Sequence, residues 1–356
     1  MSKRLRSNLI TYGIVIVAFV VLQSLIATKS LSNALQGQLI PICAYVCMAV
    51  SLNLVVGISG ELSLGHAGFM SVGAFSGVTA AALLNGANMS PVVILIVSLL
   101  VGAIVAGVVG FVVGIPVMRL HGDYLAIVTL AFGEIIKNVL NSLYVGFDAS
   151  GLHFSMTDTA SLNMKQGTII MNGAQGATGI AKISTFTVGI ILVLITVTVV
   201  LNLMNSRSGR AIMAVRDNRI AAESVGINVT KYRLMAFVVA AALAGMAGAF
   251  YAQGLSSIVP KKFDFNLSIL ILVFVVLGGM GNIRGSIISA ALLTVLPELL
   301  RAINDWRMMI YAVLLIVVTI ATNNPTARQF FSSLASRFKR PVREAATEKG
   351  GEADGR

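Results

Sequence analysis

The 356-residue sequence is poor in charge: only 11% of its side chains are charged, whereas 56% are hydrophobic. A soluble globular domain usually carries about a quarter charged residues. A chain with this composition lacks the polar surface that a domain in water needs. The composition therefore excludes an ordinary soluble protein and indicates one that resides in a membrane.

Proline, histidine and cysteine are also scarce, at seven, three and two residues. Few prolines leave the apolar stretches uninterrupted, and many reach the roughly 20 residues that a helix needs to cross a bilayer. In lipid every backbone polar group must be paired internally, so such continuous runs form helices. Cys43 and Cys47 share one run without a neighbouring histidine or carboxylate, which favours packing over metal binding.

Signals for catalysis are missing as well. No Gly-Lys pair occurs, so the phosphate loop Gly-x-x-x-x-Gly-Lys-Ser/Thr is absent from the sequence. Gly57-Ile58-Ser59-Gly60 resembles the serine motif of intramembrane proteases, but a serine nucleophile needs a histidine base within reach, and no histidine lies in a second span. We expect a chain that is not an enzyme and has no catalytic residue, cofactor or metal.

The apolar runs predict an all-α, polytopic bundle of about ten membrane-spanning helices. The third run is rich in glycine and could be broken, and the eighth and ninth form a tight hairpin joined at residues 282–285. The predicted spans cover about residues 8–27, 38–56, 63–84, 91–117, 124–144, 185–204, 234–254, 267–283, 286–300 and 306–321.

The distribution of positive charge predicts the orientation of these spans. Most of the 26 lysines and arginines fall at the N-terminus, in alternate loops and in the C-terminal tail. Positive charge marks the cytoplasmic side, so both termini are expected there. We predict a transmembrane domain over 1–325, with a cytoplasmic loop at 205–233, an external loop at 145–183 and a disordered tail at 326–356. The net charge of +12 is thereby explained without nucleic acid.

Small residues recur at helical spacing within the spans. Such spacing lets helix backbones approach closely in lipid. It predicts tight helix packing at three pairs: Gly73 and Gly77, Gly110 and Gly114, and Ala244 and Gly248.

The loop at 205–233 predicts two short helices. The first covers about 210–216 and ends at Asp217-Asn218, either of which can cap the second. The second covers about 219–225 and ends at Gly226, while Thr230 could cap the next span. Small residues flanked by arginines suit a docking surface for a cytoplasmic partner, but also a helix lying on anionic lipid.

Two polar side chains within the spans are candidates for the translocation path. Glu134 lies near the middle of the fifth span, where ionisable groups are costly and often functional. Lys137 follows at i+3 and can neutralise it, so a structural pair is the alternative. His66 lies between two glycines of the third span, where a satisfied polar contact and a gating role are both open.

Four segments resemble the branched-chain amino acid ABC permease family of the LivM type, and the resemblance covers about residues 40–325. They are SLNLVVGISGELSLGHAGFMSVGAF (51–75), HGDYLAIVTLAFGEIIKNV (121–139), RDNRIAAESVGINVTKYRLMAF (216–237) and SILILVFVVLGGMGNIRGSIISAALLTVLPELLR (268–301). The resemblance implies that the 205–233 loop docks on an ATPase subunit. Ile220 stands where the family's Glu-Ala-Ala motif begins. The implied docking residues are Arg210, Arg216, Asp217, Ala221, Ala222, Glu223 and Gly226.

The resemblance further implies a permease subunit of an inner-membrane importer that works by alternating access. Its implied partners are a second homologous permease, two cytoplasmic ATPase subunits that hydrolyse ATP, an extracytoplasmic substrate-binding protein and membrane lipid. The implied substrates are branched-chain amino acids. Urea or short amides, or ion-coupled transport through Glu134, are the alternatives.

Overall fold

The computed structural model describes residues 3–28, 32–85, 89–120, 122–148, 151–162, 164, 167–300 and scattered positions between 306 and 316. The chain divides into two units, Met1–Leu299 and Leu300–Arg356. The elements below belong to the first unit. The tail predicted at 326–356 lies outside the described residues.

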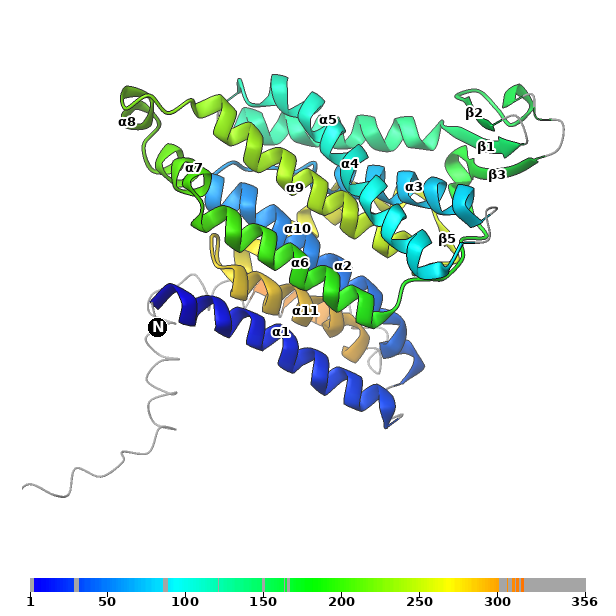
Figure 1. Cartoon of the computed structure of the whole chain (residues 1–356), viewed down its shortest axis with the longest axis horizontal. Helices are drawn as coiled ribbons and strands as arrows, with labels where there is room; N and C mark the ends of the chain where they lie inside the picture. The colour runs from blue at the N-terminus through cyan, green and yellow to red at the C-terminus, as the bar shows by residue number, and fades with distance from the viewer. Residues whose placement is uncertain are drawn as a thin grey trace, which may run out of the picture. The chain divides into compact units, whose positions relative to one another are not determined.

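Within the described residues, nine helices of 14 to 27 residues make up most of the first unit, as Figure 1 illustrates. They are α1 (Lys3–Ala27), α2 (Asn33–Asn53), α3 (His66–Asn85), α4 (Pro91–Val117), α5 (Asp123–Asn141), α6 (Phe186–Asn205), α9 (Val229–Ala252), α10 (Phe265–Gly278) and α11 (Ile283–Leu299). A π-helical turn, η1 (Leu54–Ser59), extends α2. Two short helices, α7 (Arg207–Asp217) and α8 (Arg219–Ser224), connect α6 with α9.

The structure confirms a multi-pass helical membrane protein but not ten spans. Within the described residues, six helices are long and apolar enough to cross a membrane, at 8–27, 33–59, 66–85, 91–117, 186–205 and 229–252. The predicted spans at 124–144, 267–283 and 286–300 correspond to α5, α10 and α11, which fail that length and hydropathy test. The tenth, at 306–321, falls largely outside the described residues. The third span is continuous as α3 from His66 onward.

The prediction of an all-α chain is wrong for the polar segment before α6. Three antiparallel strands form a sheet in the order β2-β1-β3: β1 (Tyr144–Asp148), β2 (Gly151–Ser155) and β3 (Gly167–Asn172). A second pair joins β4 (Ala177–Thr178) to β5 (Ser257–Ile258), a partner far along the chain. Strands β1 and β2 form a local hairpin in which Asp148 pairs with Gly151, whereas β3 and β5 pair with partners farther away along the chain. Pairing between distant segments leaves no periodic signal in the sequence.

Glycine and alanine bring α3, α4 and α9 into direct backbone contact. A Cβ atom on Gly73 of α3 would lie 2.0 Å from the carbonyl oxygen of Gly245 in α9, and one on Gly248 would lie 2.0 Å from that of Met70. A Cβ atom on Gly110 of α4 would meet the Ala241 side chain at 2.5 Å. The close helix packing predicted from the small-residue spacing is therefore confirmed.

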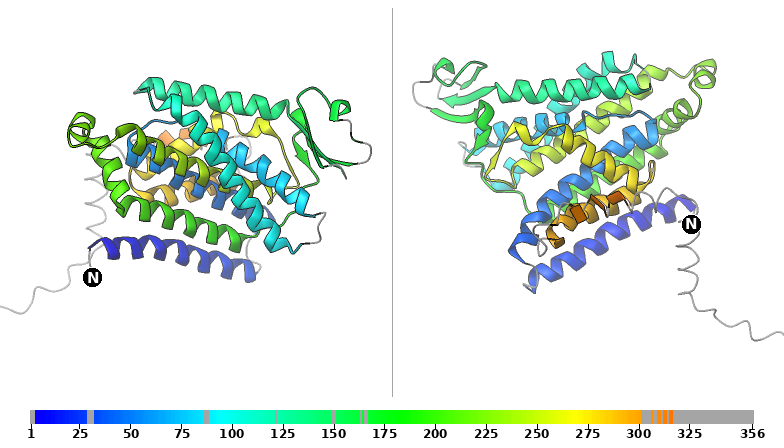
Figure 2. Two further views of the ribbon diagram at one scale, coloured as in Figure 1. Left: turned by 45° about the horizontal axis from the view of Figure 1, so that its top comes forward. Right: turned by 180° about the vertical axis from the view of Figure 1, so that it is seen from behind.

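The bundle has two distinct ends. Helices α7 and α8 and the start of α1 lie at one end, and the β1–β3 sheet lies at the other, in all three views (Figures 1 and 2). Helices α10 and α11 form the predicted hairpin, but its turn is at 279–282, slightly earlier than expected. Gly279 and Gly281 take positive φ angles of 88° and 81° there, which ends α10 before Asn282.

Candidate functional site

The polar segment between α6 and α9 folds into a compact α7–α8 hairpin (residues 207–224) because each of its helices has a side-chain cap. The Ser206 hydroxyl accepts a hydrogen bond from the Gly209 amide at 3.0 Å, which caps α7. Asn218 Oδ1 accepts one from the Ala221 amide at 3.0 Å and caps α8. Asn228, rather than the predicted Thr230, caps α9 through the Lys231 amide at 3.0 Å. These bonds satisfy amides that a helix start leaves unpaired.

Gly226 ends α8 as predicted. Its φ of +83° is a conformation that glycine adopts without steric cost. The Gly226 amide donates to the Glu223 carbonyl and the Ile227 amide to the Ala222 carbonyl, each at 3.0 Å. This pair of bonds is a Schellman motif. Ile227 then packs on a small apolar cluster of Val215, Ala222 and Val229, which holds α7, α8 and the start of α9 together.

The outer surface of α8 combines charge with exposed aliphatic side chains. Ile220 is 79% exposed and Val225 is 74% exposed, although both belong to a polar segment rather than a membrane span. Arg219 forms an ion pair with Glu223 at 3.1 Å on the same helix. Exposed aliphatic residues bordered by charges are typical of a surface that another protein covers.

The hairpin lies against a break between α2 and α3. After η1, Gly60 takes a φ of +75°, and residues 60–65 are non-helical before α3 begins at His66. Asn53, fully buried, fixes the start of η1: its Oδ1 accepts from the Gly281 amide at 2.8 Å and its Nδ2 donates to Ser286 Oγ at 2.9 Å. The η1 turn that leads into the break, residues 60–65, is therefore held against the α10–α11 turn.

Arg216 of α7 forms the direct contact between the hairpin and the break. Its Nη1 donates to the Gly57 carbonyl of η1 at 2.8 Å. Its stem covers Gly60 so closely that a Cβ atom there would lie 2.6 Å from Arg216 Cγ. Its Nη2 also forms an ion pair with Asp217 at 3.0 Å. A shift of α7 would consequently act on the π-helical turn through this side chain.

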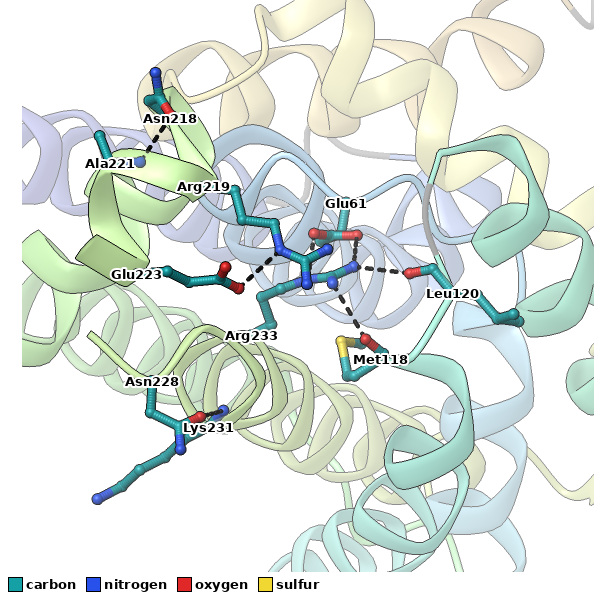
Figure 3. A network of polar contacts seen from close by, with 10 residues as sticks. All are labelled: Glu61, Met118, Leu120, Asn218, Arg219, Ala221, Glu223, Asn228, Lys231 and Arg233. Atoms are coloured by element: carbon teal, nitrogen blue, oxygen red, sulfur yellow. Dashed lines mark hydrogen bonds and ion pairs between the residues drawn. The ribbon is translucent and has the colours of Figure 1, made fainter. Parts of the chain in front are cut away.

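A second link joins the start of α9 to the break (Figure 3). Arg233, only 4% exposed, donates from Nη2 to Glu61 Oε2 at 2.6 Å, and its Nε lies 2.5 Å from Oε1. Its guanidinium also donates to the carbonyls of Met118 and Leu120, at 3.1 and 3.2 Å, beyond the end of α4. One buried side chain thus holds together α4, α9 and the break. Together with Arg216 and Arg219 it lines a cavity of about 320 Å³.

The structure places the other predicted site residues in different surroundings. Ala221 and Glu223 are exposed on α8, whereas Ala222 is buried. Arg210 lies apart from the break, near the start of α1. His66 is buried, and its Nε2 lies 2.8 Å from Ser51 Oγ, so it has a polar partner. Glu134 forms an ion pair with Lys137 on α5.

Glu61 and Arg233 are the residues that the sequence analysis missed. Both fall inside segments that carry the family resemblance, but they are 172 residues apart, and one sequence offers no sign that they pair. A lone glutamate between two apolar helices was the available signal, because an isolated charge there needs a partner.

Apolar helices of spanning length, packed through glycines and tied at one end to a polar hairpin, define a multi-pass helical membrane protein. The family model described as branched-chain amino acid transport system, permease component, matches residues 34–319. The chain belongs to this family.

Individual relatives agree with the family match. The high-affinity branched-chain amino acid transport system permease protein LivM of Salmonella typhimurium is 34% identical over 292 residues, and that of Escherichia coli is 35% identical over 300. Each match covers 78% of this chain and 66% of the relative. The probable LivH permease protein of Methanocaldococcus jannaschii is 27% identical over 172 residues, which is 48% of this chain and 46% of that protein. No solved structure gives a significant match.

Proposed function

We propose that the chain is a permease subunit of an ATP-driven importer in the inner membrane, and that it carries branched-chain amino acids into the cell. A second, homologous permease subunit completes the pathway. Two cytoplasmic ATPase subunits supply the energy, and an extracytoplasmic binding protein delivers the substrate. The substrate class rests on the LivM relatives, whose names specify branched-chain amino acids.

The observation that carries this proposal is the exposed surface of α8. Ile220 and Val225 lie at the tip of a hairpin whose other side is fixed to the α2–α3 break. An apolar side chain that faces lipid is already shielded from water. An exposed aliphatic pair on a polar segment is not, so its burial under a protein partner would lower the free energy. An ATPase subunit seated on α8 fits this requirement.

The placement of charge supports a cytoplasmic position for the hairpin. Arginines gather at the hairpin end of the bundle: Arg210 and Arg284 line a cavity beside the start of α1, and Arg216, Arg219 and Arg233 line the cavity beside the break. The opposite end carries the sheet and the lysines of the 3-10 turn Pro260–Lys262, which follows β5. By the positive-inside rule the hairpin end faces the cytoplasm and the sheet faces outward. Phe154 and Met156, each 63% exposed near the sheet, are available to the binding protein.

The contacts of the hairpin suggest how ATP hydrolysis drives transport. Movement of the ATPase shifts α8, and the Val215, Ala222 and Val229 cluster transmits the shift to α7 and α9. Arg216 then acts on Gly57 in η1, and Arg233 acts on Glu61 at the start of the break, so η1 and the start of the break move together. The bundle changes between outward-open and inward-open packings without covalent chemistry in this chain. We place His66, at the end of the break, on the path, and Glu134 as a second candidate.

A co-purification experiment tests the proposal. The full chain is extracted from its native membrane in mild detergent, and the proteins that co-elute are identified by mass spectrometry. We expect a second hydrophobic permease and at least one ATPase with a phosphate loop. Ile220→Ser should reduce ATPase recovery, while Phe154→Ser, which removes another exposed apolar side chain at the other end, should not. A folded chain that elutes alone at full yield would contradict the importer and favour a secondary carrier.

A further inference from the structure

A second polar cavity, of about 400 Å³, lies at the hairpin end of the bundle. Four parts of the chain form it: the start of α1, the end of α6, helix α7 and the turn that begins α11. None of the described residues that line it is acidic. Its polar lining residues are Asn8, Thr11, Asn205, Arg210, Asn282 and Arg284.

Two arginines from different elements give this cavity its positive charge. Arg284 Nε donates to Thr11 Oγ1 at 2.9 Å, which ties the α10–α11 turn to α1. Arg210 Nη1 donates to the Asn205 carbonyl at 3.1 Å, which holds that side chain against the end of α6. Both guanidinium groups border the same space. Arginine is the side chain best suited to hold a phosphate group, because its planar donors match the oxygens.

The start of α11 adds to this positive potential. Helix α11 is 17 residues long, and its first residues, Ile283 and Arg284, line the cavity. The first turn of a helix carries partial positive charge that favours an anion, although the Gly285 amide already donates to Asn282 Oδ1 at 3.4 Å. Two cations and a helix start, with no carboxylate among the described lining residues, favour an anionic ligand, and the phosphate group is the class that fits this chemistry.

The position of the cavity indicates where this phosphate comes from. The apolar span of α1 begins at Asn8, a lining residue, so the cavity lies at the level where α1 enters the hydrocarbon. The same span is only 11% buried by the described chain. We propose that the cavity binds the headgroup phosphate of an anionic phospholipid, whose acyl chains extend along α1. The lipid would then join α1 to α6, α7 and α11.

Lipid retention by the purified full-length chain tests this proposal. The wild type, Arg210→Gln and Arg284→Gln are placed in detergent with equal phosphatidylglycerol and phosphatidylcholine, and bound lipid is measured by native mass spectrometry. One arginine near a membrane surface contributes about 1 kcal/mol to the binding of anionic lipid, which is about fivefold in affinity. We expect each variant to lose about fivefold of its preference for phosphatidylglycerol.

Arg207→Gln is the matched control. Arg207 is exposed on the same helix α7 and does not line the cavity, so its removal changes the net charge alone. Its lipid preference should equal that of the wild type. Should Arg284→Gln fail to fold because α1 loses its contact through Thr11, Arg210→Gln decides, since Arg210 bonds only five residues away, to the Asn205 carbonyl.

Two results would overturn the proposal. Equal phosphatidylglycerol retention by Arg210→Gln, Arg207→Gln and the wild type would show that the cavity does not select the lipid. Competition by millimolar inorganic phosphate without any preference between the two lipids would show that a free anion is the ligand. Neither result depends on whether the chain works in an ATP-driven importer.

Discussion

At the scale of single residues, the ion pair of Arg233 and Glu61 is the contact on which the α2–α3 break depends most. Both side chains lie largely out of water, and Arg233 also satisfies two backbone carbonyls. Arg233→Leu would leave the Glu61 carboxylate buried without its partner. Removing one member of a buried pair typically costs about 3–5 kcal/mol. We expect a clear drop in the melting temperature of the detergent-purified chain.

The double variant Arg233→Leu with Glu61→Leu distinguishes two causes of a lower melting temperature: the unpaired Glu61 charge and the lost packing of the Arg233 side chain. It removes the uncompensated charge, so its melting temperature should recover partly towards the wild type. If it melts no higher than Arg233→Leu alone, the coupling between the two side chains is weaker than the contact distances indicate.

Gly226 has a backbone conformation that favours glycine, and it lies beside the proposed ATPase contact on α8. No atom lies within 4 Å of the Cβ that a substitution would add, but the φ of +83° disfavours other residues. Gly226→Trp combines that strain with a bulky ring beside the proposed ATPase contact. We expect membrane insertion to be intact and ATP-dependent uptake to be lost. Gly226→Asn, which tolerates the same conformation, should retain uptake. Normal uptake by Gly226→Trp would argue against docking at this site.

At the scale of elements, the interface of α3 and α9 is set by glycines that leave no room for a side chain. Gly73→Val would place its branched side chain against the Gly245 backbone, where even a Cβ atom lies 2.0 Å from the carbonyl oxygen. The helices would have to separate, so folded yield should fall severely. Gly13→Val is the control, because nothing lies within 4 Å of the added atom on α1. Equal yields in size-exclusion chromatography would contradict the packing.

The helices and strands differ in how well the sequence predicts them. The spans of α1, α4 and α6 are long and apolar enough that their position follows from hydropathy alone. The caps of the hairpin followed from Asn218 and Gly226, because those residues carry a local conformational signal. The sheet was missed because β1 finds β3 only through folding, and the Arg233–Glu61 pair was missed for the same reason. Helix spans and helix caps can be predicted from one sequence, because they depend on neighbouring residues. Contacts between distant segments cannot be predicted in this way.

At the scale of the whole molecule, the two ends of the bundle differ in kind, and the proposed direction of transport rests on this difference. One end presents arginines and a capped hairpin, and the other presents a sheet with exposed aromatic and aliphatic residues. The α2–α3 break lies near the hairpin end, so a partner there reaches the bundle interior through short contacts. A partner at the sheet acts only through the length of the helices. This asymmetry suits energy input at the hairpin and substrate delivery at the sheet.

The orientation behind this argument can be measured on the intact chain with thiol labelling. Its two cysteines, Cys43 and Cys47, are both buried, so they should give little background with a membrane-impermeant maleimide. Thr157→Cys, exposed near the sheet, should be labelled in cells whose outer envelope is open but whose inner membrane is sealed. Met280→Cys, exposed in the α10–α11 turn, should be labelled only after that membrane is permeabilised. The reverse pattern would place the hairpin outside, where no ATPase can reach α8, and would remove the physical basis for an ATP-driven importer.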